Sequence, residues 1–222
     1  MGTSYSRLRL EHHRHTMRTL DPAGSDRSNR EHDRYVADAA GVHTTMKMER
    51  PPGRSPEQVA AAIADVLADA GAEFVASLPD GWIAPLIKHL DRDRRFRHVP
   101  VNREESAVGL CSGVFFSGRP GVALMGASGF LTCIYAITKI SYTYQIPLLF
   151  LITLRGAPGD DARYHVSNGL YLRPVIAAID IPALYVEQIS DLPKIASAYR
   201  HASVLSRPYV VALGRDLLKG TQ

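Results

Sequence analysis

Two hydrophobic periods alternate along the chain after residue 55. Short apolar runs bounded by Gly, Pro and Asp are typical of strands, and longer stretches with apolar residues three and four apart predict helices. The expected strands are 74–78, 98–101, 122–125, 147–153, 184–187 and 209–213, and the expected helices are about 56–70, 82–90, 104–117, 129–144, 172–178 and 191–206. This alternation predicts a three-layer α/β/α domain with a mostly parallel six-stranded sheet.

The first helix has a clear start signal. Ser55 is suited to the N-cap, a proline follows at the first helical position, and Gln58 stands where a capping box needs it. Residues 1–54 carry no sustained apolar period and are rich in Arg, His, Ser and Asp. We therefore expect a disordered basic, His-rich tail over 1–54 and one domain over 55–218. Met46 or Met48 is a candidate natural start, which leaves open whether residues 1–47 belong to the native protein.

Composition narrows the class of protein. The net charge is +4, and the first 54 residues hold ten Lys/Arg against seven Asp/Glu, so most of the excess charge lies in the tail. No stripe of basic and aromatic residues follows, which argues against a nucleic-acid partner. Two cysteines give neither a disulfide framework nor metal-ligand spacing. No apolar run is long enough for a membrane span or a leader, so we expect a cytoplasmic protein.

Four loops should meet at one edge of the sheet. In parallel sheets ligands bind beyond the carboxyl ends of the strands. The loops there are 79–81, 102–104, 126–129 and 155–169. Their convergence predicts a binding site. Neither a nucleophile elbow nor a zinc-peptidase motif is present in the sequence.

Glu104 is the first candidate within these loops. On a helix it shares a face with Val108, Cys111 and Phe115. A carboxylate against an apolar face needs a partner or a function. The alternative is an acid that opposes the helix dipole in the first turn, which is common. Glu105 is expected to be the solvated neighbour.

The other two loops are each open to two interpretations. The segment 126–129 contains two glycines between a strand and a helix, so its amides could contact an anion or a flat ligand, or it is an ordinary turn. His165 and Arg155 lie in the long loop 155–169. His165 could transfer protons and Arg155 could hold an anionic substrate, or both are surface residues.

Four segments in order resemble one family. They are Phe-Val-Ala-Ser-Leu-Pro-Asp (74–80), Val-Asn-Arg-Glu-Glu-Ser-Ala-Val-Gly (101–109), Val-Ala-Leu-Met-Gly-Ala-Ser-Gly (122–129) and Ile-Pro-Leu-Leu-Phe-Leu-Ile-Thr-Leu-Arg-Gly-Ala-Pro-Gly (146–159). The chain resembles the pyrimidine-binding (PYR) half of thiamine-diphosphate-dependent 2-oxoacid decarboxylases. The nearest branch is the sulfopyruvate decarboxylase alpha subunit and phosphonopyruvate decarboxylase. The resemblance covers about residues 55–218.

The resemblance implies roles for particular residues. A family glutamate meets the aminopyrimidine ring of the cofactor, and counting nine residues back from Gly113 identifies it as Glu104. A carboxyl group bonded to the ring shifts it towards the imino form, which removes the thiazolium C2 proton. His165 would share catalysis with Glu104 and, with Arg155, would contact the substrate. The implied cofactor-binding residues are Pro79, Asp80, Glu104, Ser128 and Gly129, and no residue of this chain is implied to bind a metal.

Two departures from the family pattern bear on the substrate and the partner. The segment 126–132 lacks the two asparagines that the family commonly has there, so a hydrophobic or aromatic 2-oxoacid, or carboligation, stays open. A diphosphate-binding (PP) domain, which would hold Mg²⁺, does not follow residue 213. We therefore expect a separate PP-domain beta subunit that holds most of the thiamine diphosphate and Mg²⁺, in a hetero-oligomer. The competing hypothesis is a non-catalytic PYR-like module that binds or regulates a partner.

Overall fold

The computed structural model describes residues 53–220, so the tail expected over 1–54 lies almost wholly outside the described residues. The helices are α1 (Pro56–Asp69), α2 (Ala84–Leu90), α3 (Glu104–Phe115), α4 (Ala127–Thr132), α5 (Ile134–Ala136), the π-helix η1 (Ile137–Tyr142), the 3-10 turns η2 (Arg163–His165) and η3 (Ile189–Asp191), α6 (Val166–Ala178), α7 (Pro193–Leu205) and α8 (Arg215–Lys219). The strands are β1 (Phe74–Ser77), β2 (Arg97–Pro100), β3 (Gly121–Met125), β4 (Leu148–Thr153), β5 (Ala183–Val186) and β6 (Pro208–Leu213).

The six strands form one sheet in the order β2-β1-β3-β4-β6-β5, and every neighbouring pair is parallel. All residues of β3 and β4 are buried, as expected for central strands covered on both faces. The prediction of a six-stranded α/β/α sheet is confirmed, and the sheet is wholly parallel.

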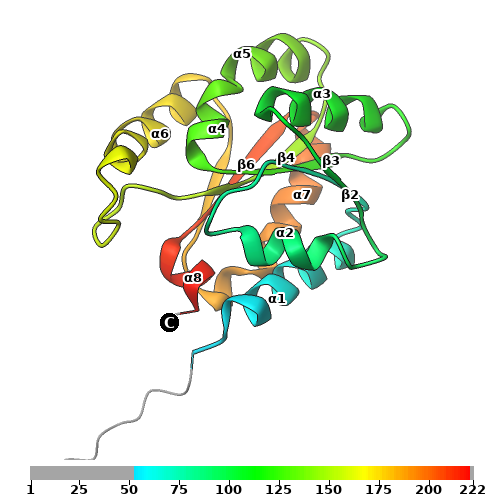
Figure 1. Cartoon of the computed structure of the whole chain (residues 1–222). Helices are drawn as coiled ribbons and strands as arrows, with labels where there is room; N and C mark the ends of the chain where they lie inside the picture. The colour runs from blue at the N-terminus through cyan, green and yellow to red at the C-terminus, as the bar shows by residue number, and fades with distance from the viewer. Residues whose placement is uncertain (1–52, 221–222) are drawn as a thin grey trace, which may run out of the picture. The chain divides into compact units, whose positions relative to one another are not determined.

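Two helical layers cover the sheet (Figure 1). Apolar residues of α1, α2, α7 and α8 pack on one face, and those of α3, α4, η1 and α6 pack on the other. The capping box expected at Ser55 is present, with Ser55 Oγ accepting from the Gln58 amide and Gln58 Oε1 accepting from the Ser55 amide. Within residues 53–220, no helix is both long and apolar enough to cross a membrane.

The order in which strands are added to the sheet reverses at β1, because β2 lies on one side of β1 and β3 lies on the other. The helix after β1, α2, packs on one face of the sheet, and the helix after β3, α4, packs on the other. The chain therefore leaves the carboxyl ends of these two neighbouring strands towards opposite faces of the sheet, which is the place where open parallel sheets bind ligands. This geometry puts the segments 79–81 and 126–129 side by side.

Two helices differ from expectation. The helix expected over 129–144 begins at Ala127 and is divided into α4, α5 and η1. The helix expected at 172–178 begins at Val166, so the loop after β4 is shorter than the sequence suggested. Pro174 lies inside α6, and its missing N–H is tolerated at an exposed position. The short helix α8 was not predicted.

Candidate functional site

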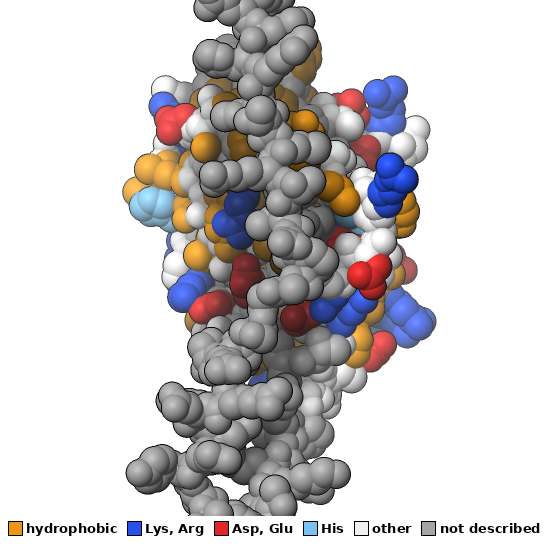
Figure 2. Space-filling model, turned by 90° about the vertical axis from the view of Figure 1, so that its left-hand side faces the viewer, with side chains coloured by type: hydrophobic (Ala, Val, Ile, Leu, Met, Phe, Trp, Pro, Cys, Tyr) orange, Lys and Arg blue, Asp and Glu red, His pale blue; other side chains and the backbone are white. Residues whose placement is uncertain are grey.

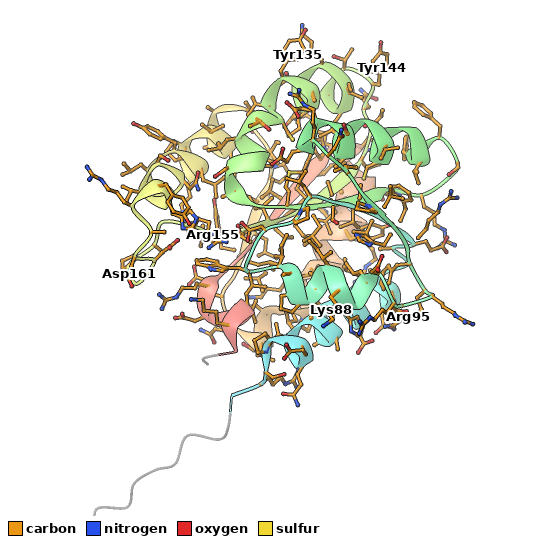
Figure 3. The ribbon with its side chains drawn as sticks, viewed as in Figure 1. Lys88, Arg95, Tyr135, Tyr144, Arg155 and Asp161 are labelled. Atoms are coloured by element: carbon orange, nitrogen blue, oxygen red, sulfur yellow. The ribbon has the colours of Figure 1, made fainter. Side chains whose placement is uncertain are left out.

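The four loops expected to converge do lie at the carboxyl edge of the sheet. Asp80 follows β1, Glu104 follows β2, Gly126 follows β3 and Arg155 follows β4. Figure 3 shows Arg155 at this edge, whereas the exposed Tyr135 and Tyr144 lie away from it, in α5 and just after η1. Figure 2 looks onto the end of the molecule where the strands finish, and its visible part carries acidic and basic side chains interspersed with hydrophobic ones.

Glu104 is the first residue of α3 and is half-buried. Its carboxylate lies against the backbone of Gly129, where an added Cβ would overlap the carboxylate carbon and one of its oxygens. Only glycine therefore allows this close approach. Within residues 53–220, no hydrogen bond or ion pair engages the Glu104 carboxylate. The neighbouring Glu105 pairs with Arg103 at 3.3 Å, and the hydrogen bond from Arg103 lowers the pKa of Glu105.

The loop after β3 is held by residues from two other elements. The Ala127 amide donates to Thr153 Oγ1 at 3.2 Å, so this amide is not free for the ligand that the sequence suggested. Asn168 Nδ2 donates to Ser128 Oγ at 2.9 Å, and the Asn168 side chain is buried. Asn168 is a site residue that the sequence did not reveal. The segment 126–132 contains no asparagine, and α6 supplies an amide beside Ser128 instead.

Asp80 and Arg155 form a buried ion pair. Arg155 Nη2 lies 2.6 Å from Asp80 Oδ1, and the side chains are 7% and 16% exposed. The guanidinium stacks on Trp82, 3.5 Å from the ring centroid, and the Trp82 amide donates to Asp80 Oδ1 at 2.9 Å. Arg155 was expected as a substrate-binding or surface residue, and the structure shows a buried cation whose charge Asp80 already balances. Arg155 Nε is buried and has no hydrogen-bond partner among the residues that the structure describes.

The loops after β1 and β3 touch at Asp80. A Cβ added to Gly126 would lie 2.7 Å from Asp80 Oδ2, so Gly126 permits the contact. Pro79, the residue before Asp80, is exposed. The structure therefore brings Gly126 against Asp80 and Gly129 against Glu104 at this edge of the sheet.

His165 lies at the far side of the same edge. Its Nδ1 is 2.9 Å from Asp160 Oδ1, and its ring meets Trp82 edge-on at a centroid distance of 6.2 Å. Trp82 thus connects His165 to the Arg155–Asp80 pair. The alternative interpretation of His165 as a surface residue does not fit the structure, because its side chain is only 12% exposed.

A second histidine has a serine and an aspartate as neighbours. His98 Nε2 lies 2.7 Å from Ser77 Oγ, and His98 Nδ1 lies 3.3 Å from Asp91 Oδ1. The set has the atoms of a hydrolytic triad. Ser77, however, is completely buried within β1, so its hydroxyl is not exposed to a substrate. We interpret these contacts as structural.

The cysteines are also structural. Cys111 and Cys133 are free and buried. Burial raises the pKa of each thiol to about 12, which disfavours the thiolate needed for metal binding or nucleophilic attack. Within residues 53–220 there is no group of three or more His, Cys, Asp or Glu side chains that could hold a metal ion.

Comparison with known proteins identifies the fold family. The family described as thiamine pyrophosphate enzyme, N-terminal TPP binding domain, matches residues 57–170. The chain belongs to this family. It is a PYR domain of a thiamine pyrophosphate enzyme, and the match covers the four loops at the carboxyl edge.

The individual relatives of this PYR domain are decarboxylases or decarboxylase subunits. Sulfopyruvate decarboxylase subunit alpha of Methanocaldococcus jannaschii is 31% identical over 160 residues, which are 71% of this chain and 92% of the relative. The subunit of the same name from Methanococcus maripaludis is 28% identical over 157 residues, 71% of this chain and 93% of the relative. Phosphonopyruvate decarboxylase of Streptomyces hygroscopicus is 30% identical over 98 residues, 43% of this chain and 24% of that longer protein. The chain is thus homologous to nearly the full length of the alpha subunits.

Proposed function

We propose that this chain is the PYR-domain subunit of a two-subunit thiamine-diphosphate-dependent decarboxylase acting on an anionic 2-oxoacid, with its PYR domain spanning residues 55–218. The supporting observation is the Glu104 carboxylate, which lies against Gly129 without a partner among the described residues. Homology over 92% of a sulfopyruvate decarboxylase alpha subunit supports the same class.

The residues around Glu104 fit the pyrimidine end of the cofactor. Gly129 lacks the Cβ that would overlap the Glu104 carboxylate, so this half-buried carboxylate keeps its place at the carboxyl edge of the sheet. There it could bind one nitrogen of a planar ring. When bound, thiamine diphosphate supplies the electron sink for loss of carbon dioxide from a 2-oxoacid. Glu104 would hold a proton at the ring nitrogen and orient the ring.

A partner subunit is proposed to complete the site. The described residues offer no cluster of acidic side chains for the Mg²⁺ that accompanies a diphosphate. Beside the loop after β4, the large apolar side chains of Tyr164, Val166, Leu170 and Tyr171 are exposed. A PP-domain beta subunit seated over this edge would cover them and bring its metal and diphosphate site opposite Glu104.

The 2-oxoacid would lie between Glu104 and His165. Asp80 balances the charge of the buried Arg155, so the proposal of an anionic substrate rests on the homology to sulfopyruvate decarboxylase alpha subunits. His165 is placed to exchange protons with the substrate. The missing asparagines in the segment 126–132 leave the acyl group to be determined by assay.

Reconstitution tests the proposal. The full chain is mixed with a PP-domain partner, thiamine diphosphate and Mg²⁺, and release of aldehyde and carbon dioxide is measured with sulfopyruvate, phosphonopyruvate and an aromatic 2-oxoacid. We expect turnover only when both chains are present. Turnover by this chain alone would refute the divided site. Acyloin as the main product would identify a carboligase, and tight binding of the partner without turnover would identify the regulatory module.

A further inference from the structure

The carboxylate of Asp160 joins the two ends of the loop between β4 and α6. Asp160 Oδ2 accepts a hydrogen bond from the Gly156 amide at 3.0 Å, and Asp160 Oδ1 lies 2.9 Å from His165 Nδ1. Gly156 has a φ of +76°, and a Cβ there would collide with the His165 carbonyl and with Gly169. Asp160 therefore ties the start of the loop to its end, and its side chain is only 6% exposed.

The contact determines which imidazole nitrogen of His165 carries the proton. An ionised carboxylate can only accept hydrogen bonds, so the proton between the two groups belongs to Nδ1 of a neutral ring. Burial, the largest single effect, raises the pKa of Asp160, but the hydrogen bonds from Gly156 and His165 and the charge of His165 together lower it below its ordinary value. Asp160 is therefore ionised at neutral pH. No described residue hydrogen-bonds His165 Nε2.

The position of the ring connects this pair to the rest of the site. His165 meets Trp82 edge-on, and Trp82 lies beneath Arg155, which is paired with Asp80. Three interlocking contacts thus hold the imidazole at the same sheet edge as Glu104. A ring held on one nitrogen by a buried acid has a fixed orientation as well as a fixed tautomer.

We propose that Asp160 is the positioning residue for His165 and fixes the Nδ1–H tautomer, which makes Nε2 the atom that carries protons in the proposed decarboxylation. The inference rests on the proposed function. In that reaction the carbon that loses carbon dioxide must gain one proton before an aldehyde is released. The imidazolium form of His165 gives that proton from Nε2, and the neutral ring recovers a proton from water. Asp160 balances the positive charge of the imidazolium without taking up a proton itself.

Asp161 offers a matched control. It is the next residue along the loop, has the same charge and is exposed, and Figure 3 shows it at the outer end of the loop. Asp161→Asn removes the same charge from the loop without touching His165. A general electrostatic effect would appear in both variants, whereas an effect of the hydrogen bond would appear only in Asp160→Asn.

The first measurement needs no cofactor or partner. The full chain is labelled with ¹⁵N-histidine, the His165 signals are identified by their loss in His165→Gln, and spectra are recorded at about pH 9, where an ordinary histidine is neutral. We expect a proton on Nδ1 and none on Nε2, the same result in Asp161→Asn, and loss of this preference in Asp160→Asn. A proton on Nε2 in the unmodified chain overturns the proposal, and this test stands even if Asp160→Asn fails to fold.

The second measurement uses the reconstituted pair. Asp160→Asn should lower kcat by about 10–100-fold with KM little changed, Asp160→Glu should recover part of the loss, and Asp161→Asn should resemble the unmodified enzyme. Equal losses in the asparagine variants of Asp160 and Asp161 would contradict a specific positioning role. A pair that releases no aldehyde, although His165 has the Nδ1–H tautomer, would refute the proposed function and the proton transfer but leave the effect of Asp160 on the tautomer intact.

Discussion

Asp80 and Glu104 occupy equivalent positions in the fold, but only Asp80 has hydrogen-bond partners among the described residues. Each lies just beyond the carboxyl end of a parallel strand at the same edge of the sheet. Asp80 accepts from the Trp82 amide and from Arg155, whereas Glu104 has no partner among the described residues. A paired carboxylate stabilises the loops it joins, while a half-buried unpaired one is left to bind something else. The comparison suggests a structural role for Asp80 and a ligand-binding role for Glu104.

The largest effect should come from the unpaired carboxylate. Glu104→Gln keeps the size of the side chain and removes its charge, so we expect the reconstituted pair to lose on the order of 10²–10⁴ in kcat. The stability of the isolated chain should hardly change. Glu105→Gln, in the next position on α3, is the control and should keep nearly full activity. Equal activity of the two variants would show that Glu104 has no special part in the reaction.

Removing the paired carboxylate should act mainly on stability. Asp80→Ala leaves the Arg155 guanidinium buried without its counter-ion, which we expect to lower the free energy of unfolding by about 3–5 kcal/mol. The exposed pair of Glu73 and Arg119, with N···O at 2.7 Å, provides the control, because Glu73→Ala should cost less than about 1 kcal/mol. Denaturant unfolding of the full chain measures both. Similar losses would mean that burial of the Asp80 pair has little effect.

Gly129→Ala tests the space beside Glu104. The new methyl group would overlap the Glu104 carboxylate, so we expect a loss of about 1–3 kcal/mol in stability and a clear fall in kcat. Gly113→Ala is the control on α3, because a Cβ added there would meet nothing within 4 Å, and alanine should raise helix stability by about 0.5–1 kcal/mol. Full activity of Gly129→Ala would show that the carboxylate can move without consequence.

The smallest expected effect is on the thermal stability of the chain at acidic pH. The pKa of Asp160 is lowered in the folded state, so its contribution to stability is present above the unfolded value of about 3.9 and is lost as the pH falls through the folded pKa. The Tm of the unmodified chain should therefore exceed that of Asp160→Asn at neutral pH, and the gap should narrow below about pH 4. Asp161→Asn, which removes a charge from an exposed position of the same loop, is measured beside it as the control. A gap that stays constant in acid would mean that Asp160 is protonated in the fold or that its charge is irrelevant.

The strands and most helices could be predicted because their signals are local. The continuous apolar run before Thr153 identifies a central strand, and the capping residues at Ser55 identify the start of α1. The start of α6 at Val166 could not be predicted in the same way. Its first turns expose Val166, Leu170 and Tyr171, so the sequence has no clean amphipathic period there.

The order of residues was enough to establish the alternation of strands and helices, and hence the parallel sheet and the edge at which a site would form. Through its resemblance it also singled out Glu104 within that edge. Only the folded structure revealed which side chains pair with one another at this edge. Asp80 and Arg155 are 75 positions apart, and Ser128 and Asn168 are 40 apart. Contacts over such separations depend on how the loops pack at neighbouring strand ends, because no short-range pattern specifies a partner that far along the chain.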